Sequence, residues 1–462
     1  IEALDANGAR LPVERVRVSS AAAPEAPPGA KPLVRRIEEA AAEHGERFIG
    51  IDLMEWDNDL FANGRSSWRK QGADSDRIRS LGINPDPPKT REEAVALIES
   101  MFRLVRETYG GGRLLAMNSL SIWDHYGLEF GSAAAYSEIT GQYDERPRLR
   151  LAASRGAARQ YGKPWIAYLV NACFFHGQVG MTSASLFYRE LMLSIMAGCN
   201  LYEQESSGHY FKNRAPFLYL EPLLDADAFV RRHPDRGVPY TPIALGLDWL
   251  HGSARWGSVF YFLPIERPDR TIPVFGELLL PSRPDATPEE QEQKLETDNW
   301  LLSNSPFGDV FDLLVLNPPS GSASLDKLSA YKVLVLLGEI RWTPPLAERV
   351  RRYVEGGGTL FCSLDQLARC PDPAWLGLAA TGKRHESRST LDAAGNRIAE
   401  LPEGSAQPVL ELAPGGGLET LYQDEAGRPL AVARSVGRGS VIACTVDALL
   451  DREGARPAPT AR

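Results

Sequence analysis

The sequence predicts an α/β protein: a (β/α)8-type TIM barrel, then a Rossmann-like α/β domain and a small C-terminal β domain. Three observations predict this class. Apolar runs of strand length alternate with amphipathic helical segments along the first half of the chain. No strand leads into a Gly-x-Gly-x-x-Gly turn, and acidic residues instead gather where several strands end. Near residue 239 a second series of alternating strands and helices begins.

The first half begins with an irregular stretch that includes the Pro- and Ala-rich run AAAPEAPPGAKP, which is typical of a connector. The strands that we expect after it span residues 48–56, 113–123, 133–139, 164–175 and 199–206. The helices that we expect between them span residues 33–42, 91–110, 146–162 and 183–198. Near-continuous apolar strands predict a parallel sheet covered by helices. A closed barrel needs eight strands, so we expect the first ones to be short, irregular or absent from this chain.

The second half contains buried-type strands with helices between them. We expect strands at residues 241–249, 310–317, 332–338 and 359–364, with helices at 287–303, 325–331 and 343–357. Short strands in a Gly- and Pro-rich context follow up to about residue 450. The predicted domains are therefore a barrel at 1–238, an α/β domain at 239–375, and a small β domain with its tail at 376–462.

Composition excludes several classes of function. The 462 residues carry 51 Lys and Arg against 60 Asp and Glu, a net charge of −9 with no basic block. This balance argues against nucleic-acid or anionic-lipid partners, and no apolar window is long enough for a membrane span. Five cysteines without paired or zinc-like spacing predict neither a disulfide framework nor a metal site. We expect a soluble protein that needs no cofactor, and the sequence leaves its compartment open.

Four runs in the second half resemble a known family. They are PYTPIALGLDWLHG, FGDVFDLLVLNPPSG, YKVLVLLGEIRWTPPLAERVRRYVEGGGTLFCSL and VGRGSVIACTV. Together they resemble the domain that follows the barrel in family 42 β-galactosidases and their relatives, a domain similar in fold to class I glutamine amidotransferases. The resemblance implies a glycosidase barrel before this domain, and a homo-oligomer, a dimer or trimer, that this domain holds together. The barrel half departs from the family because its usual Asn-Glu pair is missing.

Glutaminase chemistry is not expected of the amidotransferase-like domain. That chemistry needs a cysteine nucleophile on a sharp turn between strand and helix, supported by a histidine and a carboxylate. The turn after the strand at 332–338 carries Glu339 where the cysteine would stand, and Cys362 lies within a strand with no histidine nearby in sequence. We therefore expect this domain to be structural.

The barrel half carries acidic residues at three strand ends. Glu55, Glu138 and Glu205 each follow or end an apolar run, and a single glutamate in such a place is most often a surface or helix-capping residue. Three together favour a carboxylate site of the kind that hydrolyses glycosidic bonds. We predict that Glu138 protonates the leaving oxygen and Glu205 is the nucleophile or base, with Glu55 as the third catalytic candidate. The resemblance implies retention of configuration.

Aromatic and polar residues surround these strand ends, as in sites that stack a sugar ring and bind its hydroxyl groups. For the aromatic residues the alternative is packing in the core. The predicted substrate-binding residues are Trp56, Asp57, Asn118, Trp123, Tyr143, Asn171, His176, Glu203, His209 and Tyr210.

The function that we predict is a glycoside hydrolase that cleaves an oligo- or polysaccharide, so carbohydrate is the expected partner. Two alternatives remain open. A non-catalytic sugar-binding protein would keep the architecture without a converging pair of carboxylates. A polysaccharide lyase would use a Tyr or His base with an Arg and release an unsaturated product.

Overall fold

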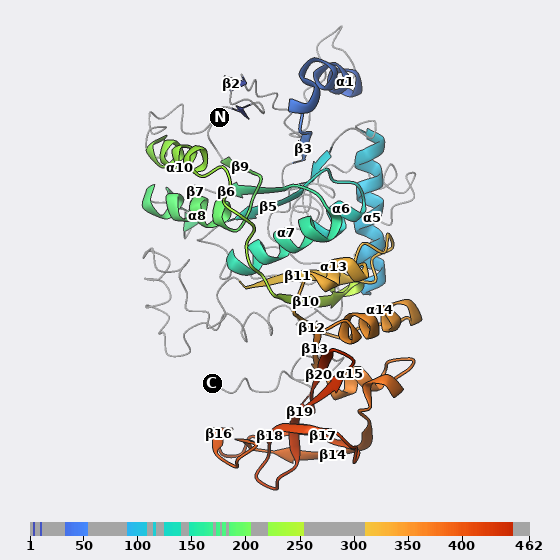
Figure 1. The fold of residues 1–462 in the computed structure, drawn as a ribbon. Helices are drawn as coiled ribbons and strands as arrows, with labels where there is room; N and C mark the ends of the chain where they lie inside the picture. Colours follow the sequence, from blue (N-terminus) through green and yellow to red (C-terminus); the bar gives the residue numbers. More distant parts are fainter. Residues whose placement is uncertain are drawn as a thin grey trace.

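The computed structural model describes residues 3–4, 10–11, 33–53, 90–108, 114–116, 124–139, 147–169, 172–175, 178–181, 184–204, 220–253 and 310–446. Two parallel sheets lie on either side of helix α7, and antiparallel strands extend from the second sheet at the far end of the molecule (Figure 1). This arrangement confirms the mixed α/β class. Closure of the first sheet into a barrel and the two domain boundaries stay predictions.

The first sheet consists of parallel strands in the order of the chain. Strand β3 (Ile51–Leu53) pairs with β4 (Leu114–Ala116), and β6 (Trp165–Leu169) lies between β5 (Ala135–Ile139) and β9 (Leu201–Gln204). A parallel bridge between Leu114 and Ser132 joins the two groups. Parallel neighbours in chain order, separated by helices, are what a βα-barrel requires.

Helices connect these strands. They are α1 (Leu33–His44), with the short η1 (Gly45–Arg47), α5 (Arg91–Thr108), α6 (Asp124–Glu129), α7 (Pro147–Tyr161), α8 (Ala184–Met196) and α10 (Leu220–Arg232). Trp165 is almost completely buried among α7, α8 and α10 side chains, as its position inside an apolar strand indicates. The N-terminal region also contains a two-residue antiparallel pair, β1 (Ala3–Leu4) and β2 (Arg10–Leu11).

One expected strand differs from the structure. The run expected as one strand at 164–175 divides into β6 and β7 (Ala172–Phe175), and β7 pairs antiparallel with β8 (Gln178–Met181). Of the run expected as a strand at 113–123, the described residues are those of β4, and helix α6 begins after the run, at Asp124. Apolar periodicity does not separate one long buried strand from a strand followed by a hairpin, because both are runs of apolar residues.

The second sheet begins with parallel strands in the order β11-β10-β12-β13. These are β10 (Ile243–Asp248), β11 (Phe311–Leu316), β12 (Val333–Leu337) and β13 (Thr359–Ser363), with η2 (Trp249–Ser253), α13 (Leu325–Ser329), α14 (Pro344–Glu355), α15 (Leu364–Ala368) and η4 (Ala374–Leu376) between or after them. Helix α14 has Thr343 as its N-cap and buries the face that carries Leu346, Val350 and Val354.

The last strands continue this same sheet. Strand β20 (Gly439–Cys444) pairs parallel with β13, and the antiparallel strands β19 (Pro429–Val436), β18 (Glu419–Gln423), β15 (Ser389–Asp392) and β16 (Arg397–Glu400) extend it. A separate pair joins β14 (Ala380–Ser387) to β17 (Gln407–Leu412). The boundary expected after residue 375 therefore falls inside a region whose strands share one sheet.

Helix α7 joins the two sheets. Gly156 packs against the backbone of β11 so closely that a Cβ at this position would lie 2.0 Å from the carbonyl oxygen of Leu313. The Gln160 side chain exchanges two hydrogen bonds with the backbone of Val315, at 2.9 and 3.0 Å, and so acts as a partner for edge strand β11. These contacts make α7 a shared layer of both sheets.

Candidate active site

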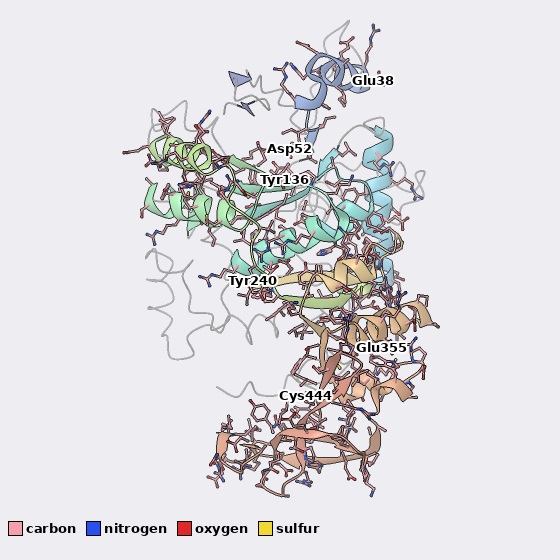
Figure 2. All side chains as sticks on the ribbon, in the orientation of Figure 1. Glu38, Asp52, Tyr136, Tyr240, Glu355 and Cys444 are labelled. Atoms are coloured by element: carbon pink, nitrogen blue, oxygen red, sulfur yellow. The ribbon has the colours of Figure 1, made fainter. Side chains whose placement is uncertain are left out.

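The inner face of the first sheet is defined by the alternation of side chains along β5. Ala135 and Ile139 pack with the surrounding helices, whereas Tyr136 packs with Leu115, Ile166 and other residues of the opposite face. Figure 2 shows Tyr136 on the side of the sheet that faces away from α7. Because residues two apart in a strand share a face, Glu138 belongs to the same face as Tyr136.

Three polar residues form one row across the carboxyl end of this sheet. Tyr168 of β6 is the register partner of Glu138 on β5 and of Glu203 on β9, and each of the three is the residue before the last of its strand. Register partners on parallel strands point to the same face. Glu138 and Glu203, both predicted as site residues, are therefore brought to the same face with one strand between them.

The hydroxyl of Tyr136 lies between two carboxylates. It donates a hydrogen bond of 2.5 Å to Oε2 of Glu203 and lies 3.4 Å from Oδ2 of Asp52 on β3. Burial, followed by the neighbouring charges of Asp52 and Glu203, raises the pKa of Tyr136 well above its ordinary value. The phenol therefore keeps its proton and remains a hydrogen-bond donor to Glu203.

Asp52, Tyr136 and Tyr168 are site residues that the sequence reasoning missed. The rings of Tyr136 and Tyr168 meet edge to face, with centroids 6.2 Å apart. Asp52 is the polar residue inside the apolar run Ile51–Leu53, and Tyr136 stands two residues before Glu138. Strand alternation was the signal that could have found Tyr136, because it places this residue on the face of Glu138.

Acidic residues on the opposite face have structural partners. The carboxylate of Asp124 accepts hydrogen bonds from the hydroxyls of Ser137 (2.5 Å) and Ser154 (2.7 Å) and from the backbone of Tyr136 (2.9 Å). These bonds tie α6 and α7 to β5. His125 lies buried within α6 with its ring near Tyr161.

Of the predicted site residues, the structure describes Glu138 and Glu203. The backbone carbonyl of Glu138 accepts a 2.6 Å hydrogen bond from the buried guanidinium of Arg150, which fixes the end of β5 to α7. The others lie outside the described residues: Glu55, Trp56, Asp57, Asn118, Trp123, Tyr143, Asn171, His176, Glu205, His209 and Tyr210.

The carboxyl end of the second sheet is closed by its own side chains. Asp248, fully buried at the end of β10, accepts hydrogen bonds from Nε of Arg341 (2.8 Å), from its backbone (3.0 Å) and from Asn317 (3.3 Å). Glu339 forms an ion pair with Arg369.

Cys362 is fully buried in β13, and burial raises the pKa of its thiol. A buried, protonated thiol is a poor nucleophile, in agreement with a structural role for this domain.

The described residues contain neither a metal-binding cluster nor a membrane-spanning helix. No group of three or more His, Cys, Asp or Glu side chains there has an arrangement that could hold a metal ion. None of the helices described combines the length and the apolar character that crossing a membrane requires.

The comparisons with known proteins found similar structures but no similar sequences. No family model and no curated protein matches the chain. Alpha-L-fucosidase isoenzyme 2 from Paenibacillus thiaminolyticus is similar with a TM-score of 0.51 and 15% identity, over 89% of this chain and 60% of that chain. A β-galactosidase from the psychrophilic Marinomonas ef1 has a TM-score of 0.45 and 14% identity, over 90% and 65%. Gan42B, a GH42 β-galactosidase from G. stearothermophilus, has a TM-score of 0.45 and 10% identity, over 90% and 62%.

The likeness to the fucosidase shows a shared fold. This chain spans between 60% and 65% of the length of the three solved structures.

Proposed function

We propose that the chain is a glycoside hydrolase whose site lies on the inner face of the first sheet, at the carboxyl ends of β5, β6 and β9. The observation that carries the proposal is the row formed by Glu138, Tyr168 and Glu203. Two glutamates on one face, at the end of parallel strands where βα-barrels carry their active sites, supply the carboxyl pair that glycoside hydrolysis needs.

The spacing of the strands supports this pairing. Neighbouring strands lie about 4.8 Å apart, so the backbones of Glu138 and Glu203 are separated by roughly 10 Å across β6. Two glutamate side chains that lean toward a shared substrate can bring their carboxyl groups into the range of roughly 5 to 10 Å that covers both glycosidase geometries. Glu205 stands two residues beyond Glu203, at the position that strand alternation would assign to the same face.

The proposed mechanism gives each carboxyl group one role. Glu138, which is 8% exposed, is assigned as the general acid that protonates the leaving oxygen. Glu205 attacks the anomeric carbon or activates water, with retention of configuration, and Glu55 is the third candidate. Glu203, held by the phenol of Tyr136, binds hydroxyl groups of the sugar or replaces Glu205 in its role.

The fold supports the proposal more generally. The solved structures similar to this chain include a fucosidase, β-galactosidases and an exo-β-1,4-mannosidase, which all act on glycosidic bonds. Fold alone does not assign a reaction, so the weight rests on the carboxylates.

The test is hydrolysis of a panel of aryl glycosides and polysaccharides by the wild-type protein and by Glu138→Gln and Glu205→Gln. Each substitution keeps the shape of the side chain and removes its acid or base. We expect turnover by the wild type and a loss of about a thousandfold in each variant, with an unchanged melting temperature. Glu221→Gln, an exposed glutamate at the start of α10, is the matched control.

Three other results would each change the proposal. Turnover that survives both substitutions would reject this residue assignment. A product that absorbs in the ultraviolet, formed without water, would indicate a lyase. Sugar binding without turnover on any substrate would indicate a non-catalytic carbohydrate-binding protein.

A further inference from the structure

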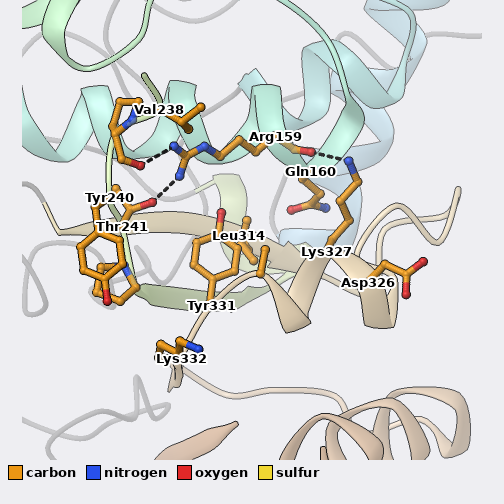
Figure 3. A pocket seen from close by; sticks show the side chains of 13 residues that line it. Arg159, Gln160, Val238, Tyr240, Thr241, Leu314, Asp326, Lys327, Tyr331 and Lys332 are labelled. Atoms are coloured by element: carbon orange, nitrogen blue, oxygen red, sulfur yellow. Dashed lines mark hydrogen bonds between the residues drawn. The ribbon is translucent and has the colours of Figure 1, made fainter. Parts of the chain in front are cut away.

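A cavity lies away from the candidate active site, where the end of α7 meets the second sheet. Its volume is about 480 Å³, and its walls come from the end of α7, the linker at residues 238–242, strand β11, helix α13 and residues 330–332. Figure 3 shows Arg159 reaching along one wall, with Tyr240 and Tyr331 on the linker side and Lys327 and Lys332 at other edges. Tyr136 lies on the opposite side of the first sheet from α7, so the two sites are separate.

Three of the lining residues, Arg159, Thr241 and Tyr331, belong to a buried ionic network behind the wall of the cavity. Asp312 is fully buried and accepts hydrogen bonds from Nε of Arg155 (2.6 Å), Nη1 of Arg159 (2.6 Å), and the hydroxyls of Thr241 (2.9 Å) and Tyr331 (2.9 Å). Two guanidinium groups thus meet one carboxylate, and one positive charge is left over. Side chains held in this way are already ordered before a ligand arrives, which lowers the entropic cost of binding.

Arg159 is the charged member of the network that lines the cavity. Its side chain is 29% exposed, and Nη2 is further fixed by a 2.8 Å bond to the carbonyl oxygen of Pro239. Two more cations line the cavity: Lys327, whose Nζ lies 2.8 Å from the carbonyl oxygen of Arg159, and the exposed Lys332. Asp326 is the one carboxylate in the lining. The lining therefore carries three positive charges and one negative charge, in a chain whose net charge is −9.

The remaining walls are apolar or aromatic. Val238 and Tyr240 are 81% and 75% exposed at the mouth, and Pro239, Pro242 and Leu314 line the interior. An exposed tyrosine ring beside cations suits a small ligand whose own ring stacks on the tyrosine while its acidic group contacts the basic side chains.

We propose that this cavity binds a small organic anion, a molecule of about the size of one sugar ring that bears a carboxylate or phosphate group. The positive surplus selects for the charge, and the volume lies within the range of small-molecule sites. The inference does not depend on the proposed glycosidase activity, because it uses none of the residues of that site.

The test compares D-galacturonate with D-galactose, which has the same ring without the charge, and with inorganic phosphate. Binding is measured by isothermal titration calorimetry on the full chain at low salt. We expect galacturonate to bind at least about tenfold more tightly than galactose, and to weaken about tenfold between about 20 mM and 500 mM NaCl. Phosphate that binds more tightly than galacturonate would identify the acidic group as a phosphate rather than a carboxylate, which still supports the proposal.

Variants connect binding to the cavity. Lys332→Ala and Lys327→Met each remove one positive charge, and each is expected to weaken galacturonate binding about five- to tenfold. Lys383→Ala, an exposed lysine on β14, is the matched control and should bind as the wild type does. Glu203→Gln should also keep the wild-type affinity, which separates this cavity from the barrel face.

Two results would overturn the proposal. One is galactose binding as tightly as both anions, which would remove the argument from charge. The other is anion affinity that is the same in Lys332→Ala, Lys327→Met and Lys383→Ala, which would place the anion elsewhere on the molecule.

Discussion

The fully buried carboxylates of the second sheet and the half-buried carboxylates on the inner face of the first sheet have different hydrogen-bond partners. In the second sheet, Asp248 and Asp312 are fully buried and each meets an arginine at 2.6 to 2.8 Å. On the inner face of the first sheet, Glu203 instead receives a hydrogen bond from a tyrosine hydroxyl, with a second carboxylate, Asp52, on the far side of that hydroxyl.

The difference separates structural from chemical carboxylates. A fully buried carboxylate that is held by an arginine fixes two elements to each other, which suits a structural joint. A half-buried carboxylate at the carboxyl end of a parallel strand can contact a substrate, which suits catalysis. This contrast, more than the presence of acidic residues, points to the first sheet as the reactive one.

The largest expected effect concerns Glu203, and it tests whether the carboxylates of the first sheet differ in role from those of the second. Glu203→Gln keeps the hydrogen bond from Tyr136 possible but removes the charge, and we expect kcat/KM toward the best aryl glycoside to fall about a thousandfold if Glu203 acts in the chemical step. A fall of only about tenfold, carried by KM, would assign Glu203 to sugar binding. The melting temperature should stay within about 2 °C of the wild type.

The second prediction concerns stability in the other sheet. Asp312→Asn leaves Arg155, which is 4% exposed, facing a neutral amide, and we expect the free energy of unfolding to fall by about 3 to 5 kcal/mol. Urea denaturation measures this loss. The control is Asp227→Asn, which breaks an exposed pair with Arg231 on α10 and should cost less than about 1 kcal/mol. Equal losses in both variants would contradict a structural role for the Asp312 network.

A smaller effect is expected at Tyr136. Tyr136→Phe removes the hydroxyl between Asp52 and Glu203. If Glu203 acts in the chemical step, we expect kcat to fall about tenfold with KM almost unchanged, because the change alters how the reacting carboxylate is held. Tyr422→Phe, on the partly exposed tyrosine of β18, provides the control. A change confined to the melting temperature would make Tyr136 a packing residue.

The smallest effect concerns pH. The pKa of Tyr136 is raised in the folded protein, so above pH 10 the unfolded chain loses this proton while the folded chain keeps it. The stability that this difference provides is complete below pH 10 and is lost as the pH rises toward the folded pKa. Tyr136→Phe should therefore reduce the slope of unfolding free energy against pH above 10 by up to about 1.4 kcal/mol per pH unit. An unchanged slope would show that Tyr136 ionises in the folded state as it does in the unfolded one.

Local patterns in the sequence were enough to locate much of the fold. The apolar run before Glu138 predicted the strand that became β5, and the Arg-rich segment before Gly162 predicted α7. Glu138 was recognised because it ends an apolar run, and Glu203 because it lies among the polar residues around the strand ends. Local patterns failed where the same apolar composition fits two structures, as in the hairpin of β7 and β8.

What the sequence by itself determined is which residues sit at strand ends and which stretches are helical, because these depend on neighbours a few positions apart. Only the tertiary structure decided which carboxylate meets which partner. Asp52 and Glu203 meet at Tyr136 although they stand far apart in the chain, and Asp312 meets two arginines of α7 because that helix packs between the sheets. Strand register and helix packing are set by contacts distant in sequence, so the charge environment that distinguishes the two sheets exists only in the folded molecule.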